Sequence, residues 1–409
     1  MSNKVPQIRF NGYIDDWEER NLSDLATFSK GKGYSKSDLV SDGFPAILYG
    51  RMYTKYESQI NDVNDTFVAD TTDAVLSQTG DVIVPGSGET PEDIARASNV
   101  NVSGVVLGGD INIIRPDAEK MDSTFLALTI SNGQQQTELI KRAQGKSVVH
   151  LHNSDLKKVN VVAPSKDEQR AISSLFNQLD NLIAANQRKL DLLKEQKKGY
   201  LQKMFPKNGA KVPELRFAGF ADDWEERKLG DAVNISSGVT GDATLQDGKY
   251  RLTRIESISQ GMLNVSKLGF TNEKPDQKYL LNLGDILYSN INSLSHIGKV
   301  ALVDMTGIYH GINLLRFQMR NGVDSEFLFQ RLNTMTMKNW AVSHANPAVS
   351  QASINQTELS KQPISSPTLT EQQQIGNFFK EIDNTIALHQ RKLDLLKEQK
   401  KGFLEKMFV

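Results

Sequence analysis

The chain has 409 residues, a length that allows about two or three domains, each large enough to bury a core. Its 48 Lys and Arg residues nearly balance its 49 Asp and Glu residues, so the formal net charge is −1 and no overall basic field indicates a nucleic-acid partner. The absence of cysteine excludes disulfides, thiol nucleophiles and cysteine-bound zinc, and no apolar run approaches the ~20 residues that cross a bilayer, so we expect a cytoplasmic protein without a membrane partner.

The first part of the chain, residues 1–163, is predicted to be a globular domain in which strands are prominent. Short apolar runs, such as residues 81–84 (DVIV) after Gly80, alternate with polar loops rich in Gly, Ser, Asn, Lys and Arg. Residues 164–206 then carry apolar side chains at spacings of three and four, which predicts one long helix with a single apolar face.

The same order of parts follows a second time. Residues 207–366 again indicate a strand-rich domain, and residues 367–409 again indicate a long helix. The segment QRKLDLLKEQKKG occupies both residues 187–199 and residues 390–402, whereas the stretches between these anchors differ. The chain is therefore an internal repeat in which near-identical helices alternate with diverged domains. This pattern favours helices that meet one kind of partner twice and domains that meet two different ligands.

The two long helices need a partner for their apolar faces. A helix of this length spans roughly 55 Å and is too one-sided to stand alone. A duplicated domain–helix unit closes most readily around a pseudo-two-fold axis, which pairs its helices antiparallel. We therefore predict the α+β class, with two mixed, strand-rich domains separated by two long helices that form an antiparallel coiled coil. The alternative is that each helix packs only on its own domain.

Motifs for catalysis are not evident in the sequence. There is no phosphate-binding loop and no dinucleotide fingerprint. His150 and His152 alternate along a predicted strand and so share one face, which a zinc site would use, but no third ligand accompanies them. A polar surface or a face toward DNA is the favoured interpretation of the pair, and we predict no catalytic residue and no metal site.

Recognition chemistry is the remaining signal, carried by basic, aromatic and carboxamide side chains in loops and near strand ends. Lysines neutralise phosphates, and arginines and carboxamides contact base edges. In the first domain the candidate DNA-binding residues are Lys30, Lys32, Tyr34, Lys36, Arg51, Lys55, His150 and His152. In the second they are Arg251, Arg254, Asn290, Asn292, His296, Asn346 and Gln351. Each is also compatible with a solvated loop or a surface ion pair.

The repeated helical segment carries a basic face. Charged faces of helices are usually just solvated, but a solvated face tolerates drift and these copies are identical over 13 residues. We therefore predict that this face binds protein partners. The residues are Arg188, Lys189, Lys194, Lys197 and Lys198 in the first copy and Arg391, Lys392, Lys397, Lys400 and Lys401 in the second.

Several of these features together resemble the specificity subunit of Type I restriction–modification systems. The motifs are Trp17-x-x-x-x-Leu22 and Trp224-x-x-x-x-Leu229, Gly80-Asp81 and Gly284-Asp285, residues 297–301 (IGKVA), and Pro164-x-x-x-Glu168-Gln169-x-x-Ile172 with Pro367-x-x-x-Glu371-Gln372-x-x-Ile375. The resemblance extends over nearly the whole chain and includes the order of its parts. The recognition loops do not take part in it.

This resemblance implies a non-catalytic subunit in which each domain reads one half of a bipartite double-stranded DNA site. The helices would set the gap between the halves and dock two methyltransferase (modification) subunits. No cofactor would bind to this chain; S-adenosylmethionine, ATP and Mg would belong to partner subunits, which include up to two restriction/translocase subunits. The competing interpretation is a two-headed scaffold that binds no DNA and joins protein partners through its helices.

Overall fold

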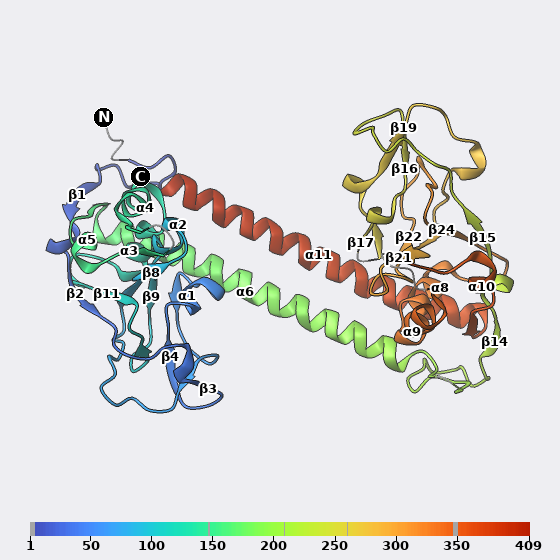
Figure 1. Ribbon diagram of the computed structural model, residues 1–409, viewed down its shortest axis with the longest axis horizontal. Coiled ribbons are helices and arrows are strands. Elements are labelled where there is room, and N and C mark those ends of the chain that lie inside the picture. The colour runs from blue at the N-terminus through green and yellow to red at the C-terminus, as the bar shows by residue number, and fades with distance from the viewer. Residues whose placement is uncertain (1–4, 146–147, 208, 260, 347–350) are drawn as a thin grey trace. The chain divides into compact units, whose positions relative to one another are not determined.

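The computed structural model describes residues 5–145, 148–207, 209–259, 261–346 and 351–409 (Figure 1). The chain divides into two compact units, the first made of Met1–Gln187 with Lys392–Val409 and the second of Arg188–Arg391. Two long helices, α6 (Lys166–Lys203) and α11 (Leu369–Met407), contribute residues to both units. The division at residues 163, 206 and 366 that the sequence suggests stays a prediction.

The first unit is a mixed structure of short helices and strands. Its strands are β1 (Glu18–Asn21), β2 (Ala26–Lys30), β3 (Leu39–Val40), β4 (Phe44–Ile47), β5 (Gln59–Ile60), β6 (Phe67–Val68), β7 (Asp81–Pro85), β8 (Ser87–Gly88), β9 (Ser98–Val100), β10 (Val106–Leu107), β11 (Ile111–Pro116), β12 (Val149–His150) and β13 (Asn160–Ala163). Its short helices are α1 (Arg51–Thr54), α2 (Pro91–Ile94), α3 (Ser123–Ile130), α4 (Gly133–Arg142) and α5 (Asn153–Leu156). The strands form sheets in the orders β2-β11-β7-β9-β5, β10-β4-β6-β3, β1-β13 and β12-β8.

The second unit repeats this plan with different details. Its strands are β14 (Glu225–Lys228), β15 (Val233–Ser237), β16 (Tyr250–Leu252), β17 (Ile258–Ser259), β18 (Met262–Leu263), β19 (Gly269–Thr271), β20 (Ile286–Tyr288), β21 (Ile291–Asn292), β22 (Val300–Leu302), β23 (Ile308–Tyr309), β24 (Leu315–Met319), β25 (Ala352–Ser353) and β26 (Pro363–Ser366). Its short helices are α7 (Leu229–Ala232), α8 (Ser325–Leu332), α9 (Met335–His344) and α10 (Gln356–Ser360). The sheets have the orders β15-β24-β20-β22, β19-β16-β23, β14-β26, β17-β18 and β21-β25.

The two units share a scaffold. The series β2-β11-β7-β9 in the first has the same strand order as β15-β24-β20-β22 in the second, and in both units an eight-residue helix (α3, α8) and a ten-residue helix (α4, α9) follow this sheet along the chain. The pairs β1-β13 and β14-β26 correspond in the same way, as do β8-β12 and β21-β25. The α+β class and the internal repeat predicted from the sequence are confirmed.

The core of the first unit includes the end of the second long helix. Phe408, which follows α11 directly, packs between Phe125 of α3 and Phe176 of α6, with ring centroids 5.9 and 5.8 Å away. Trp17 also contacts Phe125, edge to face, with ring centroids 5.7 Å apart. All four side chains are buried, so the segment after α11 belongs to the core of the first unit.

The second unit has the matching arrangement with the roles of the helices exchanged. Phe205, which follows α6, packs against Phe379 of α11 and Phe327 of α8 at 5.9 and 5.6 Å. Trp224 completes the cluster, 6.1 Å from Phe205. The phenylalanine that follows each long helix thus fills part of a core. Phe408, after α11, lies in the first unit, where α6 begins, and Phe205, after α6, lies in the second unit, where α11 begins.

Within each unit the helix segments run antiparallel. In the first unit Phe176 lies beside Phe408 and Asp180 pairs with Lys400. Residue numbers therefore rise along α6 where those of its partners on the other segment fall, as in an antiparallel pair. In the second unit Lys197 pairs with Asp383 at 2.7 Å and the later Tyr200 contacts the earlier Phe378 at 5.0 Å. The antiparallel pairing is confirmed, and the alternative of helices that pack only on their own domain is excluded.

Candidate nucleic-acid interface

The start of α6 is locked to the first domain by the Pro-x-x-x-Glu-Gln motif. The Glu168 carboxylate is fully buried and accepts two hydrogen bonds from the guanidinium of Arg9, at 2.7 and 2.8 Å. The Gln169 carboxamide accepts from the backbone N–H of Asp122 at 2.8 Å and donates to the carbonyl of Pro164 at 2.9 Å. Because a buried charge needs a partner and a buried carboxamide needs both donors and acceptors, these residue types are required at the junction.

The second copy of the motif makes the same bonds. Glu371 is buried and receives two 2.7 Å hydrogen bonds from Arg216. Gln372 accepts from the backbone N–H of Asp324 at 3.0 Å and donates to the carbonyl of Pro367 at 2.9 Å. The motif therefore fixes each helix to its domain through bonds within the protein.

The Gly-Asp motif holds the central strands in place. Gly80 and Gly284 have φ values of +92° and +84°, a region that glycine adopts without the steric cost of a Cβ. The next residue is a buried aspartate that binds an arginine on the neighbouring strand, Asp81 to Arg115 at 2.7 Å in the first unit. In the second unit Asp285 binds Arg316 at 2.6 Å. The repeat has thus kept the elements that aim the loops.

Several first-unit candidates gather at the end of β2. Lys30 ends β2, and the preceding residue, Ser29, accepts a 2.7 Å hydrogen bond from the carboxamide of Asn153. This bond brings the segment that carries His150 and His152 beside the strand end. The two imidazole rings are stacked with centroids 6.4 Å apart, and both residues are exposed. Lys30, His150 and His152 therefore share one region of the surface.

The loop after β2 places the next three candidates. Tyr34 adopts φ = +48° and its hydroxyl reaches the carbonyl oxygens of Asp70 and Thr72 at 3.1 and 3.2 Å. Burial and the Asp70 carboxylate raise the pKa of the Tyr34 phenol. Tyr34 thus anchors the loop, while Lys32 and Lys36 on either side of it are exposed.

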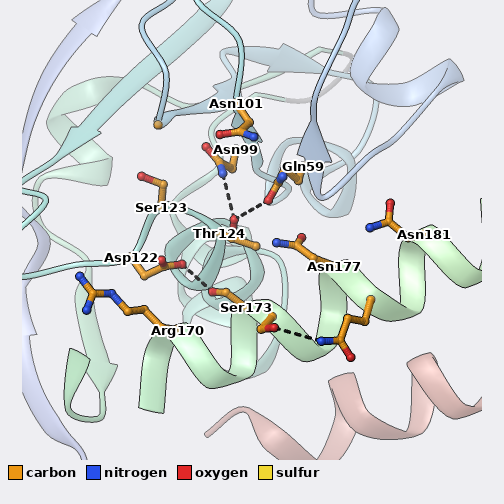
Figure 2. A pocket seen from close by; sticks show the side chains of 13 residues that line it. Gln59, Asn99, Asn101, Asp122, Ser123, Thr124, Arg170, Ser173, Asn177 and Asn181 are labelled. Carbon is orange, nitrogen blue, oxygen red and sulfur yellow. Dashed lines mark hydrogen bonds between the residues drawn. The ribbon is translucent and has the colours of Figure 1, made fainter. Parts of the chain in front are cut away.

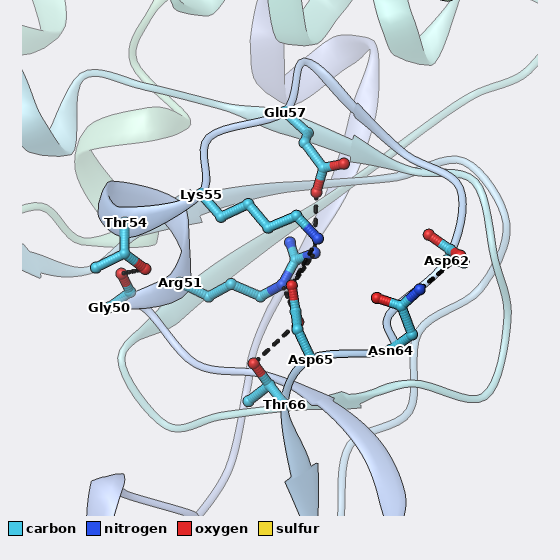
Figure 3. A network of polar contacts seen from close by, with 9 residues as sticks. All are labelled: Gly50, Arg51, Thr54, Lys55, Glu57, Asp62, Asn64, Asp65 and Thr66. Carbon is cyan, nitrogen blue, oxygen red and sulfur yellow. Dashed lines mark hydrogen bonds and ion pairs between the residues drawn. The ribbon is translucent and has the colours of Figure 1, made fainter. Parts of the chain in front are cut away.

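Arg51 and Lys55 take part in an ion-pair network with Asp65 and Glu57 (Figure 3). The buried Arg51 guanidinium lies 3.0 Å from Asp65 and 2.9 Å from Glu57, and Lys55 lies 2.6 Å from Asp65. Burial alone would raise the pKa of Asp65, but hydrogen bonds from Arg51 and Lys55 bring that pKa well below its ordinary value. The Arg51 charge holds the loop together through these ion pairs, and the predicted base contacts of Arg51 and Lys55 stay predictions.

In the second unit the amide candidates converge on the β21–β25 pair. Asn292 faces Ala352 in this pair, and the Asn290 carboxamide donates to the carbonyl of Ile354 at 3.1 Å. Asn346 forms an isolated bridge with Ser353, so three separate segments meet here. The exposed Gln351 directly precedes β25, and exposed His296 lies beyond β21 with its ring nitrogen 2.8 Å from the Ser293 hydroxyl.

Arg251 lies in a different sheet of the second unit, and Arg254 lies in the loop just after the same strand, β16. Arg251 is exposed in β16, where it faces Phe270 of β19. The side chain of Arg254 lies over Gly269 so closely that a Cβ there would come within 2.3 Å of its Nε. The structure therefore divides the second-unit candidates between two places.

A correspondence between the two first loops is hidden in the sequence but evident in the structure. A Cβ added to Gly31 would lie 2.0 Å from the carbonyl oxygen of Gly108, and one added to Gly238 would lie 2.2 Å from that of Gly311. At each of these glycines the chain passes so close to another backbone segment that a side chain would not fit. In the sequence, the only sign of this correspondence is that a glycine directly follows both β2 and β15. The residues around the two glycines differ, so the sequence alone does not reveal the match.

A polar hollow of about 510 Å³ lies between α6 and the start of α3 (Figure 2). Its carboxamides and hydroxyls form a chain in which Asn99 donates to Thr124 and Thr124 donates to Gln59, both at 2.9 Å. In the second unit the corresponding positions carry Glu326 and Lys380, which form a 3.0 Å ion pair. The residues that line the hollow in the first unit are thus replaced at these two positions by an ion pair in the second.

The basic face of the long helices is divided by the structure into two groups. Lys197 and Lys400 are half-buried and pair with Asp383 and Asp180 of the opposite helix segment. The remaining predicted partner-binding residues are exposed: Arg188, Lys189, Lys194, Lys198, Arg391, Lys392, Lys397 and Lys401. The first group stabilises the helix pair, and the second group is the one available to a partner.

Two findings concern what the described ranges lack. Within residues 5–145, 148–207, 209–259, 261–346 and 351–409, no helix is long and apolar enough to cross a membrane. Over the same ranges, no three His, Asp or Glu side chains are grouped as metal ligands.

Two relatives from one archaeon are similar to this chain, one over part of its length and one over most of it. A Methanocaldococcus jannaschii protein described as a candidate specificity subunit of the type I restriction enzyme MjaX is 37% identical over 195 residues, which are 46% of each chain. The specificity subunit of the type I restriction enzyme MjaVIII from the same organism is 22% identical over 402 residues, which are 95% of this chain and 91% of its own. The chain thus spans about half of the first relative and nearly all of the second.

Solved structures share the fold. The S subunit of a Type I restriction–modification system from M. genitalium has a TM-score of 0.68 at 16% identity, with 99% of both chains covered. A chain from a structure on complex assembly and conformational transition of the type I R-M system has a TM-score of 0.53 at 15% identity, with 96% of this chain and 97% of that chain covered.

A family model matches both copies of the repeat. The model of the Type I restriction modification DNA specificity domain matches residues 14–195 and, a second time, residues 221–398. These matches include both Trp-to-Leu starts, both Gly-Asp turns and both Glu-Gln junctions described above. The chain belongs to the family of Type I restriction–modification DNA specificity proteins.

Proposed function

We propose that the chain is the sequence-specific DNA-binding specificity subunit of a Type I restriction–modification complex, with each recognition domain reading one half of a bipartite double-stranded site. The observation that carries this proposal is the double match to the DNA specificity domain on a common scaffold. The anchors of that scaffold are the same in both units, whereas the surfaces differ: His150 lies on the β8–β12 pair of the first unit, and Asn292 lies on the corresponding β21–β25 pair of the second. Common anchors with different surfaces suit two readers of two different half-sites.

The recognition and spacer parts follow the repeat. In this proposal residues 1–163 and 207–366 are the recognition domains, and residues 164–206 and 367–409 are the spacer helices. The exposed basic residues of the helices, such as Lys198 and Lys401, dock two methyltransferase subunits. Methylation of adenine would use S-adenosylmethionine on those subunits, and up to two restriction/translocase subunits would use ATP and Mg²⁺. The specificity subunit itself catalyses nothing and works in the cytoplasm.

Exchange of one domain tests the proposal. Residues 222–363 are replaced by the matching segment of another specificity subunit, and methylated adenines are mapped genome-wide in strains that carry each version. One half of the methylated motif should change and the other should stay. A change in both halves would contradict the modular arrangement, and an absence of DNA binding with methyltransferase subunits present would favour the scaffold alternative.

The length of the helices provides a second test. A heptad inserted after Asn186 and another after His389 keeps the apolar face in register, because seven residues are close to two turns. Each insertion lengthens its helix by about 10 Å, which corresponds to about three base pairs at 3.4 Å per base pair. The gap in the methylated motif should grow by up to about three base pairs with both half-sites unchanged. An active variant with an unaltered gap would show that the helices do not set it.

A further inference from the structure

A second hollow of the first unit, of about 260 Å³, has a basic lining that the proposed recognition surfaces do not include. Arg96, which follows α2, and Lys400, on α11, border the same space. Arg96 is half-buried, with its guanidinium carbon 5.0 Å from the ring centroid of Tyr56. The described residues that line the hollow include these two cations and no carboxylate.

Hydrogen-bond donors point to an anion as the occupant. Among the described residues Arg96 has no hydrogen-bond acceptor, although a guanidinium carries five N–H groups. Two carboxamides in the lining are only partly used: Asn132 donates to the carbonyl of Leu128 at 2.7 Å, and Gln136 donates to that of Ala95 at 3.3 Å. Each has a second N–H left. Lys400 is held at this place by its ion pair with Asp180.

The second unit places basic residues at the corresponding positions. Lys197 occupies the position of Lys400 in the repeated helical segment. Lys338 is the fourth residue of α9, as Gln136 is the fourth residue of α4. Lys299 directly precedes β22, the strand that corresponds to β9. Burial, together with Lys197 and Lys299, lowers the pKa of Lys338, so both of these lysines lie close enough to act on the Lys338 ammonium group.

The comparison between the units shows what has been kept. The first-unit cluster is Arg96, Gln136 and Lys400, and the second-unit cluster is Lys197, Lys299 and Lys338. Only the Lys400 and Lys197 positions have the same residue, yet both clusters are basic and both sit where the short helices meet the long ones. Base-reading surfaces must differ between half-sites, but phosphate groups are the same along any DNA sequence. A feature that stays positively charged while its residues change suits a ligand that is the same at both sites.

We propose that the two clusters bind phosphate groups of the DNA backbone beside the half-sites, independently of base sequence. This inference rests on the proposed function, since it assumes that both units bind DNA. Arg96 offers a planar pair of N–H donors for two phosphate oxygens, and Lys299 and Lys338 act as point charges. Lys197 and Lys400 are partly neutralised by their aspartates, so the excess positive charge comes from Arg96 in one unit and from Lys299 and Lys338 in the other.

The test uses the complex of the full chain with its methyltransferase subunits. The probes are a duplex that contains the methylated motif and an unrelated duplex of equal length, with affinities measured between 50 and 200 mM salt. Arg96→Gln and Lys338→Gln should each weaken binding to both duplexes by the same factor. Each should also lower the slope of log K against log salt by about 1, the value for one lost phosphate contact. The methylated motif should stay the same, and Arg96→Lys should restore most of the affinity.

Lys228→Gln is the matched control, because it removes one exposed lysine from β14, outside both clusters. A Lys338→Gln slope equal to that of this control, in a folded complex that still prefers its motif, would overturn the inference and leave the proposed function intact. Weaker association with the methyltransferase at unchanged DNA affinity would overturn it as well, and would assign the clusters to acidic groups of that partner. A wild-type complex that prefers neither duplex would instead contradict the proposed function.

Discussion

Replacing Phe408 with Ala is expected to destabilise the first unit, although Phe408 lies almost 400 residues from Trp17 in the chain. Phe408 is only 7% exposed and its ring is within 6 Å of those of Phe125 and Phe176, as measured between centroids. Phe-to-Ala changes in cores cost about 3–5 kcal/mol in the free energy of unfolding. Because Phe408 keeps 7% of its surface exposed, we expect the lower end, about 3 kcal/mol, which is roughly a 100-fold change in an equilibrium constant.

Amide hydrogen exchange provides the assay, since it resolves the two units. Protection of β7 and α3 in the first unit should fall by roughly 100-fold, while that of β20 in the second unit should stay as in the wild type. Phe205→Ala should give the mirror result, because Phe205 fills the equivalent place in the second unit.

Leu395→Ala serves as the control on the same helix. Leu395 is 55% exposed, and its truncation should change stability by less than about 0.5 kcal/mol. Equal loss of protection in both units on Phe408→Ala, or none in either, would refute the assignment of the helix end to the first core.

Three further predictions concern buried or paired charges. Burial lowers the pKa of His310 to about 4, below its ordinary 6.5, so the folded state resists protonation; stability from this group should be complete above pH 6.5 and fall by roughly 3 kcal/mol toward pH 4 in urea unfolding, a dependence that His310→Gln should flatten. Glu168→Gln should cost about 3 kcal/mol because it leaves Arg9 buried without its countercharge, and adding Arg9→Gln should recover part of that loss; a larger loss in the double variant would contradict the pairing. For the half-exposed pair of Lys197 and Asp383, a double-mutant cycle to Ala should show about 1 kcal/mol of coupling, and zero coupling would remove it as a stabilising contact between the helices.

Much of the architecture could be predicted because its signals are local. Apolar spacing over residues 164–206 marks a helix face whatever the rest of the chain does, and two copies of one helical segment imply two copies of one structural unit. The Gly80-Asp81 and Glu168-Gln169 motifs could be recognised for the same reason. Each motif is a short run of adjacent residues, so it can be found in the sequence without knowing the fold. The bonds that explain the motifs, such as Asp81 to Arg115 and Asp122 to Gln169, are made with distant residues.

Contacts between distant segments were decided only by the tertiary structure. Arg51 and Lys197 both read as exposed cations available to a ligand, yet one is buried against Asp65 and the other pairs with Asp383. The loops at Gly31 and Gly238 correspond because each glycine passes close to another backbone segment. The residue types around the two glycines do not predict this contact.

The basic clusters show the same division most clearly. Arg96, Lys299 and Lys338 give no signal in the sequence, because each is a single cation in an ordinary stretch of chain. They become groups only when helices from opposite ends of the repeat pack beside them. The sequence by itself determined the repeat, the long helices and the family, since periodicity and motif spacing act within a segment. Only the tertiary structure shows which charges form ion pairs within the protein and which stay available to a ligand. Ion pairing and burial depend on residues that lie far apart in the chain.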